Sequence, residues 1–164
     1  ASRGLGEVYK RQQLPAAVAH IQELIAAGLD CVEQGAREVV EVPVRYDGLD
    51  LSDVAELLSM TTDELVRRHS DQQWTVEFAG FMPGFGYMSG ADWPYRIPRR
   101  DSPRTRIPPG SIALADGFTG VYPQASPGGW QIIGTTDAIF WDEKADPPAL
   151  LHPGAVIRFE VVDS

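Results

Sequence analysis

The sequence has little cysteine or histidine, which argues against two common ways of stabilising a small fold. One cysteine, Cys31, and three histidines occur among 164 residues. A disulfide framework needs pairs of cysteines, and a zinc site usually needs several Cys or His side chains at short spacing. We therefore expect neither a disulfide nor a metal site. In its helical context Cys31 is typical of a small apolar residue.

Positive charge is also scarce. Fourteen Lys and Arg residues oppose 23 Asp and Glu residues, which gives a formal net charge of −9. Nucleic-acid-binding proteins usually carry a basic face, because phosphate contacts supply most of their affinity. No apolar run reaches the roughly 20 residues of a membrane-spanning helix, and no secretory leader is recognisable. We expect neither nucleic acid nor a membrane as a partner, and we expect a cytoplasmic location.

Several catalytic motifs are missing from the sequence. It contains no His-Glu-x-x-His motif, no Gly-x-Ser-x-Gly elbow, no Walker loop and no Ser-Ser-Lys arrangement of the amidase type. Two histidines, His69 and His152, are the remaining neutral-pH bases near the part that we predict to be β-rich. His152 precedes Pro153-Gly154 and is typical of a turn. His69 ends a predicted helix, where a protonated imidazole would favour the helix dipole, and a catalytic role is the alternative.

The first part of the chain contains one predicted helix. Residues 1–12 show no apolar periodicity, and we interpret them as a non-native or truncated start. Apolar side chains at helical spacing then predict a helix from Pro15 to Ala27. Gly28 is a suitable stop for this helix.

A strand and two short helices are predicted next. Valines alternate over residues 38–44, and Pro43 indicates a strand at a sheet edge. Ser52 is the predicted N-cap of a first helix. Thr61 and Glu64 form a predicted capping box for a second helix that runs to His69.

The rest of the chain is predicted to be β-rich. Trp74, Val76 and Phe78 alternate with polar residues, which indicates a strand. Glycine and proline then recur every few residues between Gly80 and Gly134. Many short strands with frequent turns favour a barrel or a sandwich, with no helix of ten or more residues after His69. Further strands are expected over residues 111–115, 119–122, 130–133, 136–141 and 156–162.

A first unusual segment, residues 78–88, interleaves aromatic residues with glycines and one proline. Glycine lets the backbone approach a partner closely, and aromatic rings supply flat apolar walls. Phe85 and Tyr87 could therefore wall a ligand pocket. Equally, the segment could be a loop that packs on the barrel.

A second segment, residues 97–110, holds four arginines. Its prolines restrict the backbone, and arginine binds carboxylate or phosphate with two parallel hydrogen bonds. Arg104 and Arg106 could recognise a small anion, or they could pair with the surplus Asp and Glu residues. For Arg99 and Arg100 we favour such pairing.

A third segment, residues 122–134, contains Ser126, Gly128, Gly129 and Gln131. A turn at Ser126 to Gly129 would leave backbone N–H groups uncovered, and such a turn can bind an anion or an oxyanion. The alternative is a tight barrel turn anchored by Trp130.

Together these segments resemble the allophanate hydrolase subunit 1 family, also called the KipI family. The resemblance covers about residues 38–162, and each piece is weak alone. Family members often have a second proline where Gly86 stands, and a leucine where Met88 stands. The resemblance is carried by His69-Ser70, Phe81 to Tyr87, Pro98 to Arg100, Pro103 to Pro108, Gly110-Ser111, Tyr122-Pro123, Ser126 to Gln131, Asp146 to Leu151 and Pro153-Gly154.

The resemblance implies a mainly β fold. It implies a cyclophilin-like β-barrel over residues 38–164, preceded by a small, truncated α/β portion. Residues 13–37 would be the remnant of that portion.

The resemblance also implies a subunit of a multi-component, ATP-dependent amide-processing enzyme that is inactive alone. The family includes the B subunit of bacterial 5-oxoprolinase, an enzyme that opens 5-oxoproline to glutamate. The implied partners are a homologous second subunit, a third 5-oxoprolinase subunit and a small amide substrate, with ATP acting at the level of the complex. Two alternatives are a carboxyltransferase-type domain of a biotin-dependent urea carboxylase and an inhibitor of a histidine kinase.

Under the leading hypothesis each candidate residue has an expected role. His69 is the expected proton carrier, and Arg104 and Arg106 neutralise a carboxylate or a phosphorylated intermediate. The expected substrate-binding residues are Phe85, Tyr87, Ser126, Gly128, Gly129 and Gln131.

Overall fold

The computed structural model describes residues 39–162. The predicted helix at residues 15–27, Cys31 and the assignments for residues 1–37 lie outside this part of the chain. The elements in order are β1 (Val39–Val44), α2 (Leu51–Leu57), α3 (Thr62–Ser70), β2 (Trp74–Ala79), β3 (Gly86–Gly90), β4 (Arg104–Ile107), β5 (Ser111–Ala115), β6 (Phe118–Val121), β7 (Ser126–Gly128), β8 (Gln131–Thr135) and β9 (Val156–Val161).

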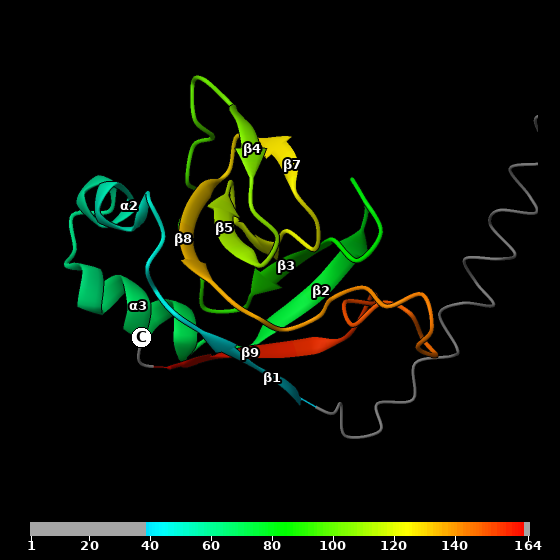
Figure 1. Cartoon of the computed structure of the whole chain (residues 1–164). Coiled ribbons are helices and arrows are strands. Elements are labelled where there is room, and N and C mark those ends of the chain that lie inside the picture. Colours follow the sequence, from blue (N-terminus) through cyan, green and yellow to red (C-terminus); the bar gives the residue numbers. More distant parts are fainter. Residues whose placement is uncertain (1–38, 163–164) are drawn as a thin grey trace, which may run out of the picture. The chain divides into compact units, whose positions relative to one another are not determined.

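Seven of the strands form a nearly closed barrel (Figure 1). Their order is β1-β9-β2-β3-β6-β5-β8, with β1 parallel to β9 and the other pairs antiparallel. Beyond β1 the chain pairs with the far end of the sheet, because Arg45 N donates to Thr135 O at 2.9 Å and Thr135 N donates to Arg45 O at 2.8 Å. This architecture confirms the prediction of a mainly β barrel.

Strand β1 forms where the alternating valines predict it. Val42 and Val44 are buried in the core, and β1 pairs along its length with β9 alone. Pro43 is tolerated because a strand with one ladder neighbour leaves alternate N–H groups without a partner strand. The edge position inferred from Pro43 is therefore confirmed.

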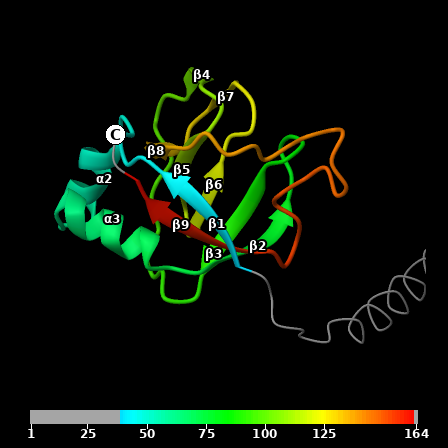
Figure 2. The same ribbon diagram turned by 60° about the horizontal axis from the view of Figure 1, so that its bottom comes forward.

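The two helices lie together on one side of the barrel, with α2 next to β8 and α3 next to β9 (Figures 1 and 2). Helix α3 begins at the predicted cap, because Thr61 Oγ1 accepts from Glu64 N at 3.1 Å. Ser52 as the N-cap of α2 is wrong, since that residue is Asp50. Tertiary contact sets the earlier start: Asp50 N donates to Ile132 O of β8 at 2.8 Å.

A bulge changes the face of strand β2. Its pairing with β3 shifts between Val76 and Phe78, so Trp74 and Val76 are buried whereas Phe78 is 46% exposed. Simple alternation would place all three on one face. Phe78 instead stacks on Tyr87, with ring centroids 4.4 Å apart.

Most of the other predicted strands form, but one does not. Strands β5, β6, β8 and β9 form at the predicted apolar runs, and no helix of ten or more residues follows α3 within residues 39–162. The strand predicted at residues 136–141 is wrong, because this stretch forms no ladder beyond an isolated bridge between Trp141 and Ala149. Phe140 is buried there as a loop side chain that packs into the core.

The apolar interior has two parts. The larger core lies inside the barrel and under the helices. The smaller lies between the barrel and a separate two-stranded ribbon of β4 and β7, which stands at one end in both views (Figures 1 and 2). The buried members of this second core are Phe85, Ile107, Ala113, Ala115, Tyr122, Trp130 and Ile132.

Candidate functional site

The β4–β7 ribbon brings the arginine-rich segment next to the glycine-rich segment. In its antiparallel register Arg104 lies opposite Gly128, and Ile107 lies opposite Ser126. The open turn expected at Ser126 to Gly129 is wrong, because Ser126 to Gly128 form strand β7. Part of that backbone is therefore already used in strand pairing, and Gly129 is the first residue after it.

A small pocket opens beside the ribbon. Its volume is about 90 Å³. Four of the predicted substrate-binding residues, Phe85, Tyr87, Gly128 and Gly129, line it together. The structure thus brings into one cavity residues that lie more than 40 positions apart in the sequence. The other lining residues are Phe81, Arg99, Tyr122, Pro127 and Trp130.

The pocket walls are aromatic rings that meet edge to face. The centroid of Phe85 lies 5.3 Å from that of Tyr122 and 5.5 Å from that of Trp130, and Tyr87 lies 5.5 Å from Trp130. Such geometry aligns the positive edge of one ring with the negative face of another. The rings can lie this close to β6 because residue 120 is glycine: a Cβ there would stand 2.8 Å from Phe85.

Tyr122 is the polar group at the base of this wall. Its side chain is buried, and burial raises the pKa of its phenol to about 12. Nearby Arg99 acts in the opposite direction on that pKa but does not outweigh the desolvation. Tyr122 therefore stays neutral at physiological pH.

Asp50 holds two of the four arginines. Its carboxylate accepts two hydrogen bonds from Arg104, at 2.7 and 2.9 Å, and one from Arg100 at 2.7 Å. The backbone N–H of Ile132 donates to the same carboxylate at 2.7 Å. Asp50 is 1% exposed, so this cluster is a buried ionic link between α2, β8 and the ribbon. Pairing with an acidic residue was favoured for Arg100 and was one of two alternatives for Arg104. Both arginines are paired, but with a buried aspartate and not at the surface.

Three other predicted residues lie outside the aromatic pocket. Arg106 is exposed, and among residues 39–162 its side chain has no hydrogen bond or ion pair. The Oγ atom of Ser126 is buried without a hydrogen-bond partner in the described part of the chain. Gln131 donates from Nε2 to Pro98 O at 3.1 Å.

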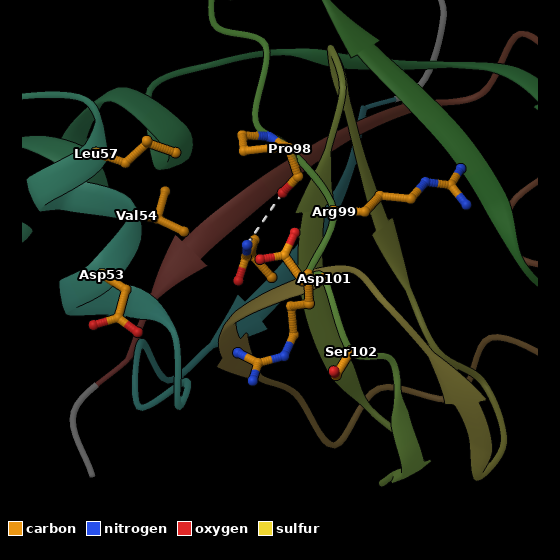
Figure 3. Close-up of a pocket in the computed structure, with 9 residues that line it drawn as sticks. Asp53, Val54, Leu57, Pro98, Arg99, Asp101 and Ser102 are labelled. Carbon is orange, nitrogen blue, oxygen red and sulfur yellow. Dashed lines mark hydrogen bonds between the residues drawn. The ribbon is translucent and has the colours of Figure 1, made fainter.

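Gln131 instead lines a larger cavity of about 480 Å³ between α2 and the segment at residues 98–102 (Figure 3). Val54 and Leu57 of α2 form its apolar side, and Asp53 and Asp101 add negative charge. In Figure 3 the side chain of Arg99 points away from α2. Arg99 thus stands between the two cavities with its charged end away from the larger one.

His69 lies in the larger core. Its Nδ1 is 2.8 Å from Tyr46 Oη, and its Nε2 is 3.0 Å from Thr119 Oγ1. Thr119 donates its one hydroxyl proton to Ala113 O, so Nε2 carries the ring proton and Nδ1 accepts from Tyr46. Burial lowers the pKa of His69 to about 3. The imidazole is therefore neutral and enclosed, and it lines neither cavity. This position does not support its expected role as a proton carrier.

Asp50 was not predicted to be a site residue, and Arg99 was not predicted to serve a ligand. Asp50 looks like a helix cap, and nothing local shows that its partners lie 50 and 54 positions away. Arg99 is one of four similar arginines in the sequence, and only the fold separates it from the other three. Phe81 and Tyr122 lie in the unusual segments of the sequence, but neither was predicted to bind a ligand.

Residues 39–162 contain neither a metal-binding cluster nor a membrane-spanning helix. In this part of the chain no three His, Cys, Asp or Glu side chains are grouped so that they could hold a metal ion. No helix described here is long and apolar enough to cross a membrane.

Comparison with known proteins gives a family match over most of the chain. The family model described as carboxyltransferase domain, subdomain C and D, matches residues 7–151. Several proteins named as the B subunit of 5-oxoprolinase are similar to it in sequence. The one from Haemophilus influenzae is 41% identical over 125 residues, which are 74% of this chain and 59% of that protein.

Two further relatives carry the same name. The Bacillus subtilis protein is 39% identical over 126 residues (75% of this chain, 52% of that protein). The Escherichia coli O157:H7 protein is 42% identical over 123 residues (73% of this chain, 56% of that protein). These relatives confirm the resemblance inferred from the sequence. The chain spans little more than half of the length of these curated relatives.

Solved structures share the fold. The crystal structure of TTHA0988 matches with a TM-score of 0.74 at 37% identity, over 86% of this chain and 29% of that one. Protein PH0987 from Pyrococcus horikoshii matches with a TM-score of 0.73 at 31% identity, over 100% of this chain and 71% of that one. The K. lactis urea amidolyase matches at 17% identity with a TM-score of 0.66, over 87% of this chain and 11% of that one, which supports the fold alone.

Proposed function

We propose that this chain, which belongs to the family of carboxyltransferase domains (subdomains C and D), is the B-subunit component of a 5-oxoprolinase. One observation carries this proposal: three curated relatives at 39–42% identity are all named as the B subunit of 5-oxoprolinase. The proposed reaction adds water across the lactam C–N bond of 5-oxoproline and yields glutamate. ATP hydrolysis drives it in the assembled enzyme, in the cytoplasm.

In this proposal the chain binds and orients the substrate. Its aromatic pocket is lined by five rings and presents one cation, Arg99. Expelling water from a site strengthens each remaining electrostatic contact. His69 has no proposed part, since its imidazole is buried and its pKa is lowered to about 3. Proton transfer and the chemistry of ATP are therefore assigned to partner subunits, a homologous second one and a third.

The arginines bound to Asp50 have a supporting role in the proposal. Arg100 and Arg104 share one buried carboxylate as their partner, and neither of them lines the aromatic pocket. Their ion pairs instead attach the β4–β7 ribbon, which forms one wall of the pocket. The likeness to urea amidolyase at 17% identity supports the barrel and does not favour the biotin-dependent alternative.

A chimeric enzyme tests the proposed function. The matched segment of the Escherichia coli relative is replaced by the aligned residues of this chain, and the product is combined with the other subunits of that enzyme. We expect ATP hydrolysis that depends on 5-oxoproline, with one glutamate formed per ATP consumed. The same relative with the segment deleted is the control. A chimera that folds and co-purifies with the other subunits but forms no glutamate would contradict the proposal.

A further inference from the structure

The aromatic pocket is a subsite for a small group. A water molecule occupies about 30 Å³ in the liquid, so a cavity of about 90 Å³ corresponds to some three waters. A carboxylate or the edge of a small ring fits this space. The nine lining residues include five aromatic side chains and no acidic one. The chemistry thus favours a flat ligand that can carry negative charge.

Among the four arginines of residues 99–106, only Arg99 lines this pocket. Arg100 and Arg104 are both bonded to the carboxylate of Asp50. Arg106 is exposed and lines none of the cavities described above. Arg99 is therefore the one cation of this segment placed to meet a ligand in the pocket.

Arg99 is also available for a ligand. Its Nε lies 3.9 Å from Asp116 Oδ2, beyond hydrogen-bond distance, and both side chains are more than half exposed. Such surface pairs contribute little and exchange readily with solvent or a ligand. The guanidinium carbon lies 5.9 Å from the centroid of the Trp130 ring, which restricts the side chain near the pocket without using its hydrogen-bond donors.

We propose that Arg99 determines specificity by binding the carboxylate of the substrate while the lactam ring lies in the aromatic pocket. This assignment rests on the proposed function and replaces Arg104 and Arg106 as the anion-binding residues. The planar guanidinium can donate two parallel hydrogen bonds to a carboxylate. Backbone at Gly129 borders the same space, since a Cβ there would stand 3.9 Å from Cβ of Arg99.

Ligand titrations of the full chain test the assignment directly. The probes are 5-oxoproline, 2-pyrrolidone, which has the ring without the carboxylate, and acetate, which has the carboxylate without the ring. We expect 5-oxoproline to shift the NMR signals of the Trp130 indole and the Gly129 amide, and Arg99→Gln to weaken this binding about tenfold or more. Binding of 2-pyrrolidone should change by less than about twofold, because it never contacts the guanidinium.

Arg96→Gln is the matched control. Arg96 is close in sequence and exposed, and within residues 39–162 its side chain has neither a hydrogen bond nor an ion pair. Its removal should leave binding of 5-oxoproline unchanged, and urea midpoints of both variants show whether the fold is intact. Equal weakening by both substitutions would mean that net charge, not Arg99, attracts the ligand. Absence of any shift at Trp130 and Gly129 would overturn the assignment.

The chimeric enzyme separates this assignment from the proposed function. If the chimera forms glutamate and Arg99→Gln leaves KM for 5-oxoproline unchanged, the role of Arg99 is wrong and the function stands. If the chain binds 5-oxoproline through Arg99 but the chimera forms no glutamate, the pocket stands and the function fails. A raised KM with a nearly unchanged kcat is the result that supports both, because Arg99 would bind ground state and transition state alike.

Discussion

Replacing Asp50 with asparagine should destabilise the protein strongly, although the change removes one charge and almost no volume. The carboxylate accepts four hydrogen bonds, three from guanidinium groups and one from the N–H of Ile132. An amide keeps one acceptor oxygen and turns an NH2 group toward donors. Arg100 and Arg104 would then lose their counter-ion at a site where Asp50 itself is 1% exposed.

The expected magnitude follows from the burial of the three groups. Removing one partner of a buried ion pair costs about 3–5 kcal/mol. The side chains of Arg100 and Arg104 keep 33% and 19% of their exposure, so water can solvate them in part. We therefore expect a loss at the lower end, about 3 kcal/mol in the free energy of unfolding. For a chain of this size that corresponds to roughly 10 °C in Tm.

Urea unfolding followed by tryptophan fluorescence measures this loss. All four tryptophans lie in the described part of the chain. With an m value of about 2 kcal/mol per molar, the midpoint should fall by about 1.5 M. The control is Asp53→Asn on the same helix: Asp53 is exposed, and within residues 39–162 its side chain has no hydrogen bond or ion pair. It should lose no more than about 1 kcal/mol, the usual value of a first-turn carboxylate.

A loss below about 1 kcal/mol for Asp50→Asn, at unchanged m, would refute this reasoning. It would mean that water replaces the carboxylate around both guanidinium groups. The ion pairs of Asp50 would then contribute as little to stability as exposed ion pairs do. The β4–β7 ribbon would be held by the apolar contacts of the second core alone.

Three more substitutions test the interior. Burial lowers the pKa of His69 from 6.5 to about 3. Between these two pH values the imidazole is protonated in the unfolded chain but not in the folded one. The free energy of unfolding therefore falls as the pH falls, by up to about 1.4 kcal/mol per pH unit. Urea midpoints between about pH 6.5 and 5 should show this slope, and His69→Gln should lack it; equal slopes would contradict the burial argument. In Gly128→Ala the new Cβ would meet Tyr122 Oη at 2.5 Å and Ile107 Cδ1 at 2.8 Å, so we expect a loss of about 1–3 kcal/mol. Gly129→Ala, whose nearest neighbours lie 3.8 Å away, should change stability by less than about 0.5 kcal/mol, and similar losses in both would show that the ribbon shifts freely.

Local pattern predicted most of the strands. Runs such as Ser111 to Ala115 are apolar and bounded by turn residues, and β5 forms there with every residue buried. The capping box at Thr61 and Glu64 predicted the start of α3, because both bonding groups lie within one helical turn. In each case the cause of the structure lies within a few residues of its effect.

The candidate site was predictable in part. Phe85, Tyr87, Gly128 and Gly129 were singled out by composition, since rings and bare backbone suit a ligand, and they do line one pocket. Which arginine serves that pocket could not be inferred from the sequence. Arg99 and Arg104 have similar neighbours in the chain, but one faces the rings and the other faces Asp50.

The amino-acid sequence by itself determined the β-rich class, the family and the residues from which the pocket is built. Only the tertiary structure decided that His69 is enclosed in the core, that Ser126 to Gly128 pair as a strand, and that Asp50 neutralises Arg104. The physical reason is the distance along the sequence over which each kind of interaction acts. Backbone propensity acts over a few residues, whereas burial and ion pairing depend on groups that only chain folding brings together.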